Sequence, residues 1–182
     1  DITSKYDLIF VTGYYKIISK DIISKIKYGI YCFHETPLPK GRGHAPLQWT
    51  ILNNKKNLTI TLFKIDDGID TGMIADQCKI PISKLDTYDI LEKKRTIGII
   101  KCFQTFFKKI SKKTITLRKQ NGKPSFQERR IPDDSELSDK IYTIEKLWDK
   151  LRICDNKEFP AFIKIEDKKI ILRYEVINND SK

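Results

Sequence analysis

Both histidines of this chain lie in one stretch rich in proline and glycine, which runs from His34 to Trp49. Proline fixes its own φ and favours extended geometry in the residue before it, whereas glycine adopts conformations that other residues avoid. A loop of this composition holds one shape. Since imidazole titrates near neutral pH, the loop is a natural place for proton chemistry. A rigid surface connection with incidental histidines would have the same composition.

A carboxylate that could work with a histidine follows in the acidic turn Asp66-Asp67-Gly68-Ile69-Asp70-Thr71-Gly72. An imidazole and a carboxylate together can transfer a proton and stabilise charge that develops during a reaction. A second interpretation makes His34, His44 and Asp70 the ligands of a metal in a hydrolase, because two histidines and a carboxylate form a known set. The histidine spacing, however, is not that of the common zinc motifs.

The elements before the loop predict how it is positioned. The apolar run 7–12, closed by Gly13, predicts a strand buried on both faces, and residues 20–26 predict a short helix. A second apolar run, 29–33, leads directly into His34. Strand, helix and strand in this order are typical of a parallel sheet, where ligands bind beyond the carboxyl ends of the strands. Gly13 and His34 both fall at such ends.

The acidic turn is predicted to join two strands. A helix over 45–52 follows the loop, with Pro46 in its first turn, where proline costs no hydrogen bond. Residues 58–65 alternate between apolar and polar side chains, which predicts a half-buried strand. Residues 73–82 predict the next strand, so the turn 66–72 connects the two.

The remainder predicts one long helix and a smaller C-terminal part. The helix begins at Asp86 or Thr87 and ends near Ile110, and its predicted core stripe consists of Ile90, Ile97, Ile100, Phe103, Phe107 and Ile110. A polar loop (118–141), a helix (143–153) and a closing hairpin follow, the hairpin formed by 162–165 and 169–176. We therefore expect an α/β fold with a mixed, mostly parallel sheet flanked by helices. Residues 1–141 form the catalytic domain, and residues 142–182 form a small β-rich appendage.

Composition narrows the class of protein. The sequence contains no apolar run of the roughly twenty residues that a membrane span needs, so we expect no membrane association. The four cysteines are widely spaced, which argues against a disulfide scaffold or a zinc knuckle and suits a reducing compartment. A net charge of +11 invites a nucleic-acid interpretation. Because the lysines are scattered over every segment, we do not expect nucleic acid as the partner.

The loop and the turn together resemble a known enzyme family. His34 is followed by Leu38-Pro39-Lys40-x-Arg42-Gly43-x-Ala45-Pro46-Leu47, and a strand then leads to Asp70-Thr71-Gly72. This pattern is similar to the formyltransferases that use 10-formyltetrahydrofolate, which include methionyl-tRNA formyltransferase and the nucleotide-sugar N-formyltransferases. The likeness continues through Arg130-x-Pro132-x-Asp134-Ser135 and Phe159-Pro160-Ala161, so it covers nearly the whole chain.

The resemblance implies a function and a set of site residues. It implies a cytoplasmic enzyme of surface-polysaccharide synthesis that transfers a formyl group from 10-formyltetrahydrofolate to the amine of a nucleotide-linked amino-deoxy sugar. The attacking amine must lose a proton, which Asp70 could accept, while His34 could stabilise the oxyanion. The cofactor-binding residues would be Gly13, Tyr14, Tyr15 and Asp67, although Asp67 could simply form the turn. The substrate-binding residues would be Lys40, Arg42, His44 and Gln48, although Arg42 could instead brace the loop.

The sequence departs from the family pattern in three ways. The family begins with a strand, a helix and a second strand that have no counterpart here, so we expect an N-terminally incomplete domain. Cys32 occupies the place of an asparagine, and Gln48 is the candidate replacement for the missing amide. Too few residues follow Ile153 for the C-terminal barrel of the tRNA-specific members, which favours the amino sugar. A methionyl-tRNA formyltransferase-like enzyme, a metal-dependent hydrolase and a basic binding module are the alternatives, and a homodimer stays open.

Overall fold

The computed structural model describes residues 5–14, 16–137 and 142–177. Strand β1 (Ile9–Val11), helix α1 (Lys20–Lys25) and strand β2 (Ile30–His34) form the expected unit, and β1 pairs with β2 in parallel. β1 lies at one edge of a four-stranded sheet of order β1-β2-β4-β5. Its residues are only half-buried, because a strand neighbours it on one side. The expectation of a strand buried on both faces is therefore wrong for β1.

The strand that is buried on both faces is β4 instead of β1. β4 (Asn57–Lys64) pairs antiparallel with β2, and β5 (Ile74–Pro81) pairs antiparallel with β4. The threonines of β4 are as buried as its leucines, so the predicted half-buried strand is fully buried. The Thr61 hydroxyl donates to the carbonyl of Thr36 and accepts a hydrogen bond from Gln77. These internal partners let polar side chains occupy a buried face.

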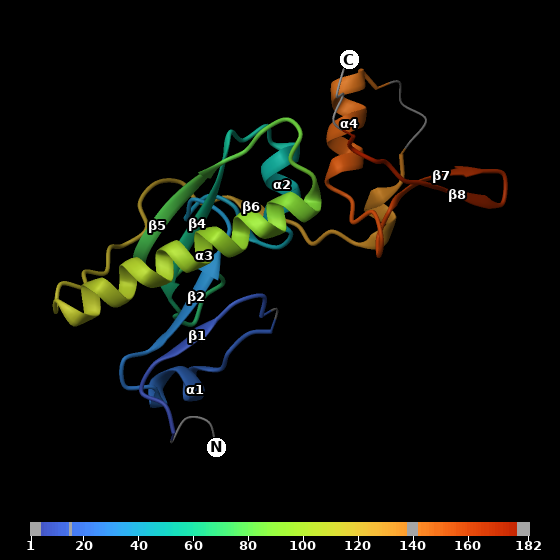
Figure 1. Cartoon of the computed structure of the whole chain (residues 1–182). Helices are drawn as coiled ribbons and strands as arrows, with labels where there is room; N and C mark the ends of the chain where they lie inside the picture. Colours follow the sequence, from blue (N-terminus) through green and yellow to red (C-terminus); the bar gives the residue numbers. More distant parts are fainter. Residues whose placement is uncertain (1–4, 15, 138–141, 178–182) are drawn as a thin grey trace, which may run out of the picture.

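The predicted α/β fold with a mixed sheet flanked by helices is confirmed. Of the three pairings between the described strands of the main sheet, one is parallel and two are antiparallel. The expectation of a mostly parallel sheet is therefore wrong for these strands, because a short turn joins β4 to β5 and makes them antiparallel. Helix α3 (Tyr88–Ser111) crosses one face of this sheet and packs on β4 and β5 (Figure 1). The expected connection between two strands at residues 66–72 is present, since the turn joins β4 to β5.

Helix α3 buries a different face from the one predicted. Its buried residues are Leu91, Gly98, Cys102 and Phe106. Of the predicted stripe, Ile97 and Ile100 are 48% and 50% exposed, and Phe103 and Phe107 are also exposed. A Cβ added to Gly98 would lie 2.4 Å from Cγ1 of Ile60, so this small residue lets α3 approach the sheet closely. The predicted stripe is wrong because the contact face combines two small residues, Gly98 and Cys102, with Leu91 and Phe106.

Short elements shape the loop that contains both histidines. Strand β3 (Arg42–Gly43) pairs in parallel with β6 (Phe126–Gln127), which lies within the predicted polar loop. Helix α2 (Pro46–Leu52) forms as expected and ends at Asn53. A 3₁₀ helix, η2 (Pro132–Ser135), follows β6. The pairing of β3 with β6 therefore fixes the loop to a segment far along the chain.

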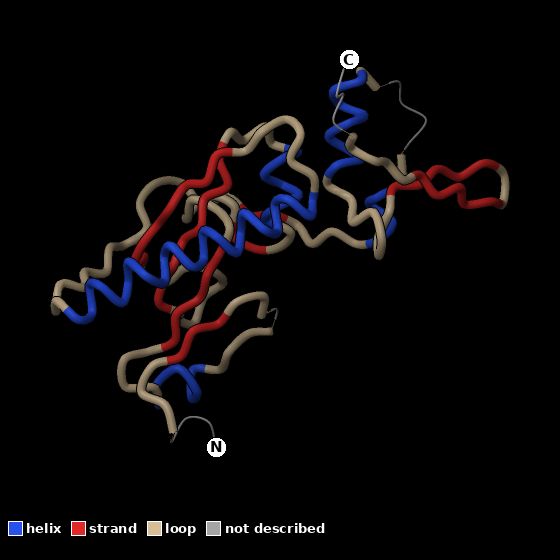
Figure 2. Tube along the Cα trace, viewed as in Figure 1, coloured by secondary structure: helices blue, strands red, loops and turns tan. Residues whose placement is uncertain are grey.

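The C-terminal part forms a separate small sheet, as predicted. Helix α4 (Ile144–Arg152) precedes strands β7 (Ala161–Ile165) and β8 (Lys168–Leu172), which pair antiparallel apart from the main sheet (Figure 2). The buried guanidinium of Arg152 donates to the carbonyls of Ser83 and Asp86 and so ties α4 to the turn before α3. The domain boundary after residue 141 stays a prediction. Within the described part of the chain, we find no helix with the length and apolar character to cross a membrane.

Candidate active site

A cavity of about 580 Å³ opens at the carboxyl ends of β1 and β2, and both predicted catalytic residues line it. His34 is the last residue of β2, and Asp70 comes from the turn between β4 and β5. Nδ1 of His34 lies 3.7 Å from Oδ2 of Asp70, and both side chains are largely buried. The fold therefore brings the imidazole and the carboxylate to one cavity, as the sequence predicted.

The orientation of His34 is fixed by a main-chain carbonyl. Nε2 of His34 lies 2.8 Å from the carbonyl oxygen of Gly41, so Nε2 carries the proton and donates it. The Thr36 hydroxyl donates to the same oxygen, and the Gly41 N–H donates to the hydroxyl of Ser125. Gly41 has φ +76°, and a Cβ there would lie 2.8 Å from Cγ2 of Thr36. Glycine is thus required, and Nδ1 is the ring atom that faces Asp70.

Asp70 is held by donors on both its side chain and its main chain. Oδ2 accepts a hydrogen bond of 2.8 Å from the N–H of Gly43, which links the turn to the histidine loop. Nε2 of Gln120 donates to the carbonyls of Asp70 and Gly72, at 2.7 and 2.8 Å. Asp70 has φ +51°, an uncommon conformation that these contacts maintain. Gln120 therefore positions the turn, a role that the sequence analysis missed.

The predicted substrate-binding residues separate into two groups. His44 and Gln48 line the cavity, where an acceptor could reach them. Arg42 donates through Nε and NH2 to Oε1 of Gln120, and Lys40 is exposed. Neither Arg42 nor Lys40 is among the cavity-lining residues. Arg42 thus braces the loop, the alternative considered from the sequence, and the binding roles of all four residues stay predictions.

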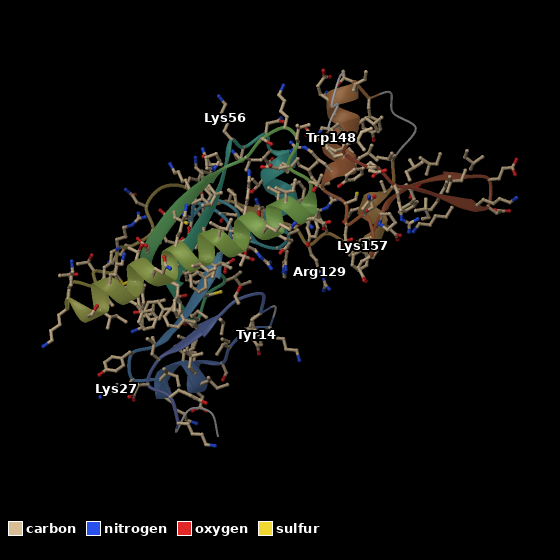
Figure 3. The ribbon with its side chains drawn as sticks, in the orientation of Figure 1. Tyr14, Lys27, Lys56, Arg129, Trp148 and Lys157 are labelled. Carbon is tan, nitrogen blue, oxygen red and sulfur yellow. The ribbon has the colours of Figure 1, made fainter. Side chains whose placement is uncertain are left out.

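The predicted cofactor-binding residues lie on the side of the acidic turn. Gly13 and Tyr14, in the loop after β1, line the cavity with Asp67. Figure 3 labels Tyr14 on that loop. The Asp67 carboxylate forms an ion pair of 2.6 Å with Lys20, and the hydrogen bond from Lys20 lowers the pKa of Asp67. Tyr15 lies outside the described residues. Their roles toward a cofactor stay predictions.

Cys32 lines the cavity at the position where the family pattern has asparagine. Burial raises the pKa of the Cys32 thiol to about 12, so the group is neutral at physiological pH. Its Sγ lies 3.6 Å from the carbonyl oxygen of Phe33. A neutral thiol that already has an acceptor is a weak donor. Gln48, which lines the same cavity, is the amide that remains available.

The metal-site interpretation gains no support from the geometry. Its third ligand, His44, is exposed, whereas His34 and Asp70 are directed to each other. Across residues 5–14, 16–137 and 142–177, no three His, Cys, Asp or Glu side chains gather as a metal-binding group would require.

The sequence of this chain is similar to that of known proteins. The family model described as formyl transferase matches residues 3–97, just over half of the chain. Methionyl-tRNA formyltransferase from Kosmotoga olearia is 34% identical over 151 residues, which cover 83% of this chain and 49% of that protein. This chain belongs to the formyl transferase family. The resemblance drawn from the histidine loop and the Asp-Thr-Gly turn is thereby confirmed.

Solved structures show the same fold. A sugar N-formyltransferase from Shewanella has a TM-score of 0.79 and 20% identity, with 97% of this chain and 73% of that chain covered. HypX from Aquifex aeolicus, in complex with tetrahydrofolic acid, has a TM-score of 0.78 and 17% identity, with 95% of this chain and 30% of that chain covered. The present formyl transferase chain spans about half the length of the curated relative from Kosmotoga.

Proposed function

We propose that this chain transfers a formyl group from 10-formyltetrahydrofolate to the amine of a nucleotide-linked amino-deoxy sugar, in the cytoplasm. The observation that carries the proposal is the 3.7 Å approach of His34 Nδ1 to Asp70 Oδ2 at the wall of a cavity. Family membership supports the reaction class, and the tetrahydrofolic acid in the HypX complex supports the cofactor.

The residues of the cavity fit a folate. The side of the acidic turn combines apolar groups such as Phe63 and Ile65 with the polar groups of the turn, which suits a flat ring that carries hydrogen-bonding edges. When bound, the folate supplies the formyl carbon. Gly13, Tyr14 and Asp67 would hold it on this side.

Asp70 and His34 have separate tasks in the proposed reaction. The amine must be neutral to attack, and it loses a proton as its bond forms; the Asp70 carboxylate accepts that proton or orients the amine. His34 donates its Nε2 proton to Gly41, so it can stabilise an oxyanion from Nδ1 only when it holds a second proton.

The polar side chains of the cavity suit a sugar acceptor. Glu35, Glu92 and Arg95 all line it. Carboxylates accept hydrogen bonds from the hydroxyl groups of a sugar, and a guanidinium donates to them. The identity of 34% to a methionyl-tRNA formyltransferase makes methionyl-tRNA the second candidate acceptor.

The test is a mass measurement with a panel of acceptors. The chain is incubated with 10-formyltetrahydrofolate and either nucleotide-linked amino sugars or methionyl-tRNA, and the gain of one formyl group is followed. Asp70→Asn should lower turnover by about a hundred- to a thousandfold and leave the fold intact. The charge-matched control is Asp89→Asn, on the exposed side of α3. Near-normal turnover of Asp70→Asn would refute the catalytic assignment. Formylation of methionyl-tRNA and of none of the amino sugars would identify tRNA as the acceptor.

A further inference from the structure

Four polar side chains on the α3 side of the cavity take no part in holding the histidine loop. Glu35 follows β2 and is 7% exposed, and Tyr88, Glu92 and Arg95 come from the first turns of α3. All four line the cavity. We call them the α3 wall.

The α3 wall lies across the sheet from the acidic turn. Successive residues of a strand point to opposite faces. Tyr31 of β2 packs on Phe106 of α3, with ring centroids 4.8 Å apart, so the odd-numbered residues of β2 face the helix. Glu35 continues that series, whereas His34 faces the other way, toward Asp70. His34 and Glu35 thus extend from opposite faces of the chain, and both line the one cavity.

The charges of the α3 wall are only partly compensated. NH2 of Arg95 bonds the Glu92 carboxylate at 2.7 Å, three residues before it on α3. NH1 of Arg95 lies 3.9 Å from Oε1 of Glu35, too far for a hydrogen bond. Nε of Arg95 is buried and has no hydrogen-bond partner among the described residues. Buried polar groups without partners cost stability, and such groups concentrate at functional sites.

We propose that Glu35 and Arg95 bind a hydroxyl group of the acceptor and thereby select a polyhydroxylated amine, an inference that rests on the proposed function. A hydroxyl both donates and accepts, so one oxygen can accept from NH1 of Arg95 and donate to Oε1 of Glu35. An oxygen about 2.8 Å from each atom spans the gap between them. The ion pair with Glu92 holds the guanidinium in place for this contact.

The first measurement separates acceptor binding from chemistry. In Glu35→Gln and Arg95→Met, the KM for the amino sugar should rise about tenfold or more, because the hydroxyl of the acceptor loses one of its two hydrogen-bond partners in the protein. The kcat should stay within about threefold, and the KM for 10-formyltetrahydrofolate should not change, since the reacting pair and the folate side are intact. Lys93→Met removes an exposed cation from the same helix outside the cavity lining and serves as the control. Thermal melting verifies that each variant is folded.

The second measurement pairs the variants with an altered acceptor. An amino sugar without the hydroxyl beside its amine should lose about as much kcat/KM with the wild-type chain as the natural acceptor loses with Arg95→Met. With Arg95→Met, removal of the hydroxyl from the acceptor should lower kcat/KM little further. Two results would overturn this inference and leave the proposed function standing. One is a variant that keeps the wild-type KM for the acceptor, and the other is a variant whose kcat/KM falls by the same factor with both acceptors. A wild-type chain that formylates no amino sugar would overturn both this inference and the proposed function.

Discussion

At the scale of single residues, main-chain groups and one distant glutamine position the reacting pair. The loop and the turn revealed His34 and Asp70 in the sequence because proline, glycine and histidine form a recognisable pattern there. Gln120 gave no such signal, since it lies in a polar segment 50 positions from Asp70. Its role arises only when the fold brings β6 beside β3. Contacts of this kind cannot be read from local pattern.

Glu35 allows a prediction about pH. Burial is the largest cause that raises its pKa above the ordinary value. A carboxyl with a raised folded-state pKa contributes stability that is present below its unfolded pKa and is lost as pH rises through the folded value. Glu35→Gln removes this loss, so the melting temperature of the variant minus that of the wild type should be more positive at pH 7.5 than at pH 4.5.

Thermal melts at constant ionic strength measure this difference. Glu175→Gln, at an exposed position, is the control and should show no comparable pH dependence. A difference between Glu35→Gln and wild type that stays constant with pH, or that falls as pH rises, would contradict the assignment of Glu35 as a buried carboxyl with a raised pKa.

At the scale of elements, the sequence predicted where α3 lies but not which face it buries. The predicted helix, from Asp86 or Thr87 to Ile110, agrees closely with Tyr88–Ser111. The face was wrong because periodicity gives weight to large apolar residues, whereas Gly98 and Cys102 form the contact with β4. Close packing of a helix on a sheet needs small residues, and these add little to a hydrophobic pattern.

Gly98→Ala tests this contact. Alanine in a helix interior is favoured over glycine by about 1 kcal/mol. The new Cβ would lie 2.4 Å from Cγ1 of Ile60, and overpacking of a core costs about 1–3 kcal/mol. We expect a net loss of about 1 kcal/mol in the free energy of unfolding, measured by urea denaturation. Ile60→Ala removes that Cγ1, so it should cost less stability in the Gly98→Ala background than in the wild type, whereas stabilisation by Gly98→Ala would show that α3 is free to move outward.

At the scale of the whole molecule, one apolar surface of α3 is open. Ile97, Ile100, Phe103 and Phe107 are exposed, and the two phenylalanines contact Phe10 of the edge strand β1, with centroids 5.0 and 5.9 Å apart. Contiguous apolar surface next to a sheet edge promotes association. The net charge of +11 opposes it by repulsion between molecules.

These opposed effects predict a salt-dependent association of this chain. Raising the salt concentration from about 0.05 M to about 0.5 M screens the repulsion, because the Debye length shortens. The average mass in sedimentation velocity should therefore increase with salt. Ile100→Lys should reduce the increase, and Lys93→Met, on the same helix, should not. Association that weakens with salt would indicate an electrostatic contact instead. Whether the associated form is a homodimer stays open.

The hydrogen bond from His34 to Gly41 has a consequence for how this loop can be studied. The acceptor is a peptide oxygen, which every residue at position 41 would possess, so replacing a side chain cannot delete the acceptor. The groups that hold the Gly41 peptide are the Thr36 hydroxyl and the Ser125 side chain. A variant at either position is therefore expected to change how firmly the His34 ring is oriented, although the replaced group bonds the peptide and not the imidazole.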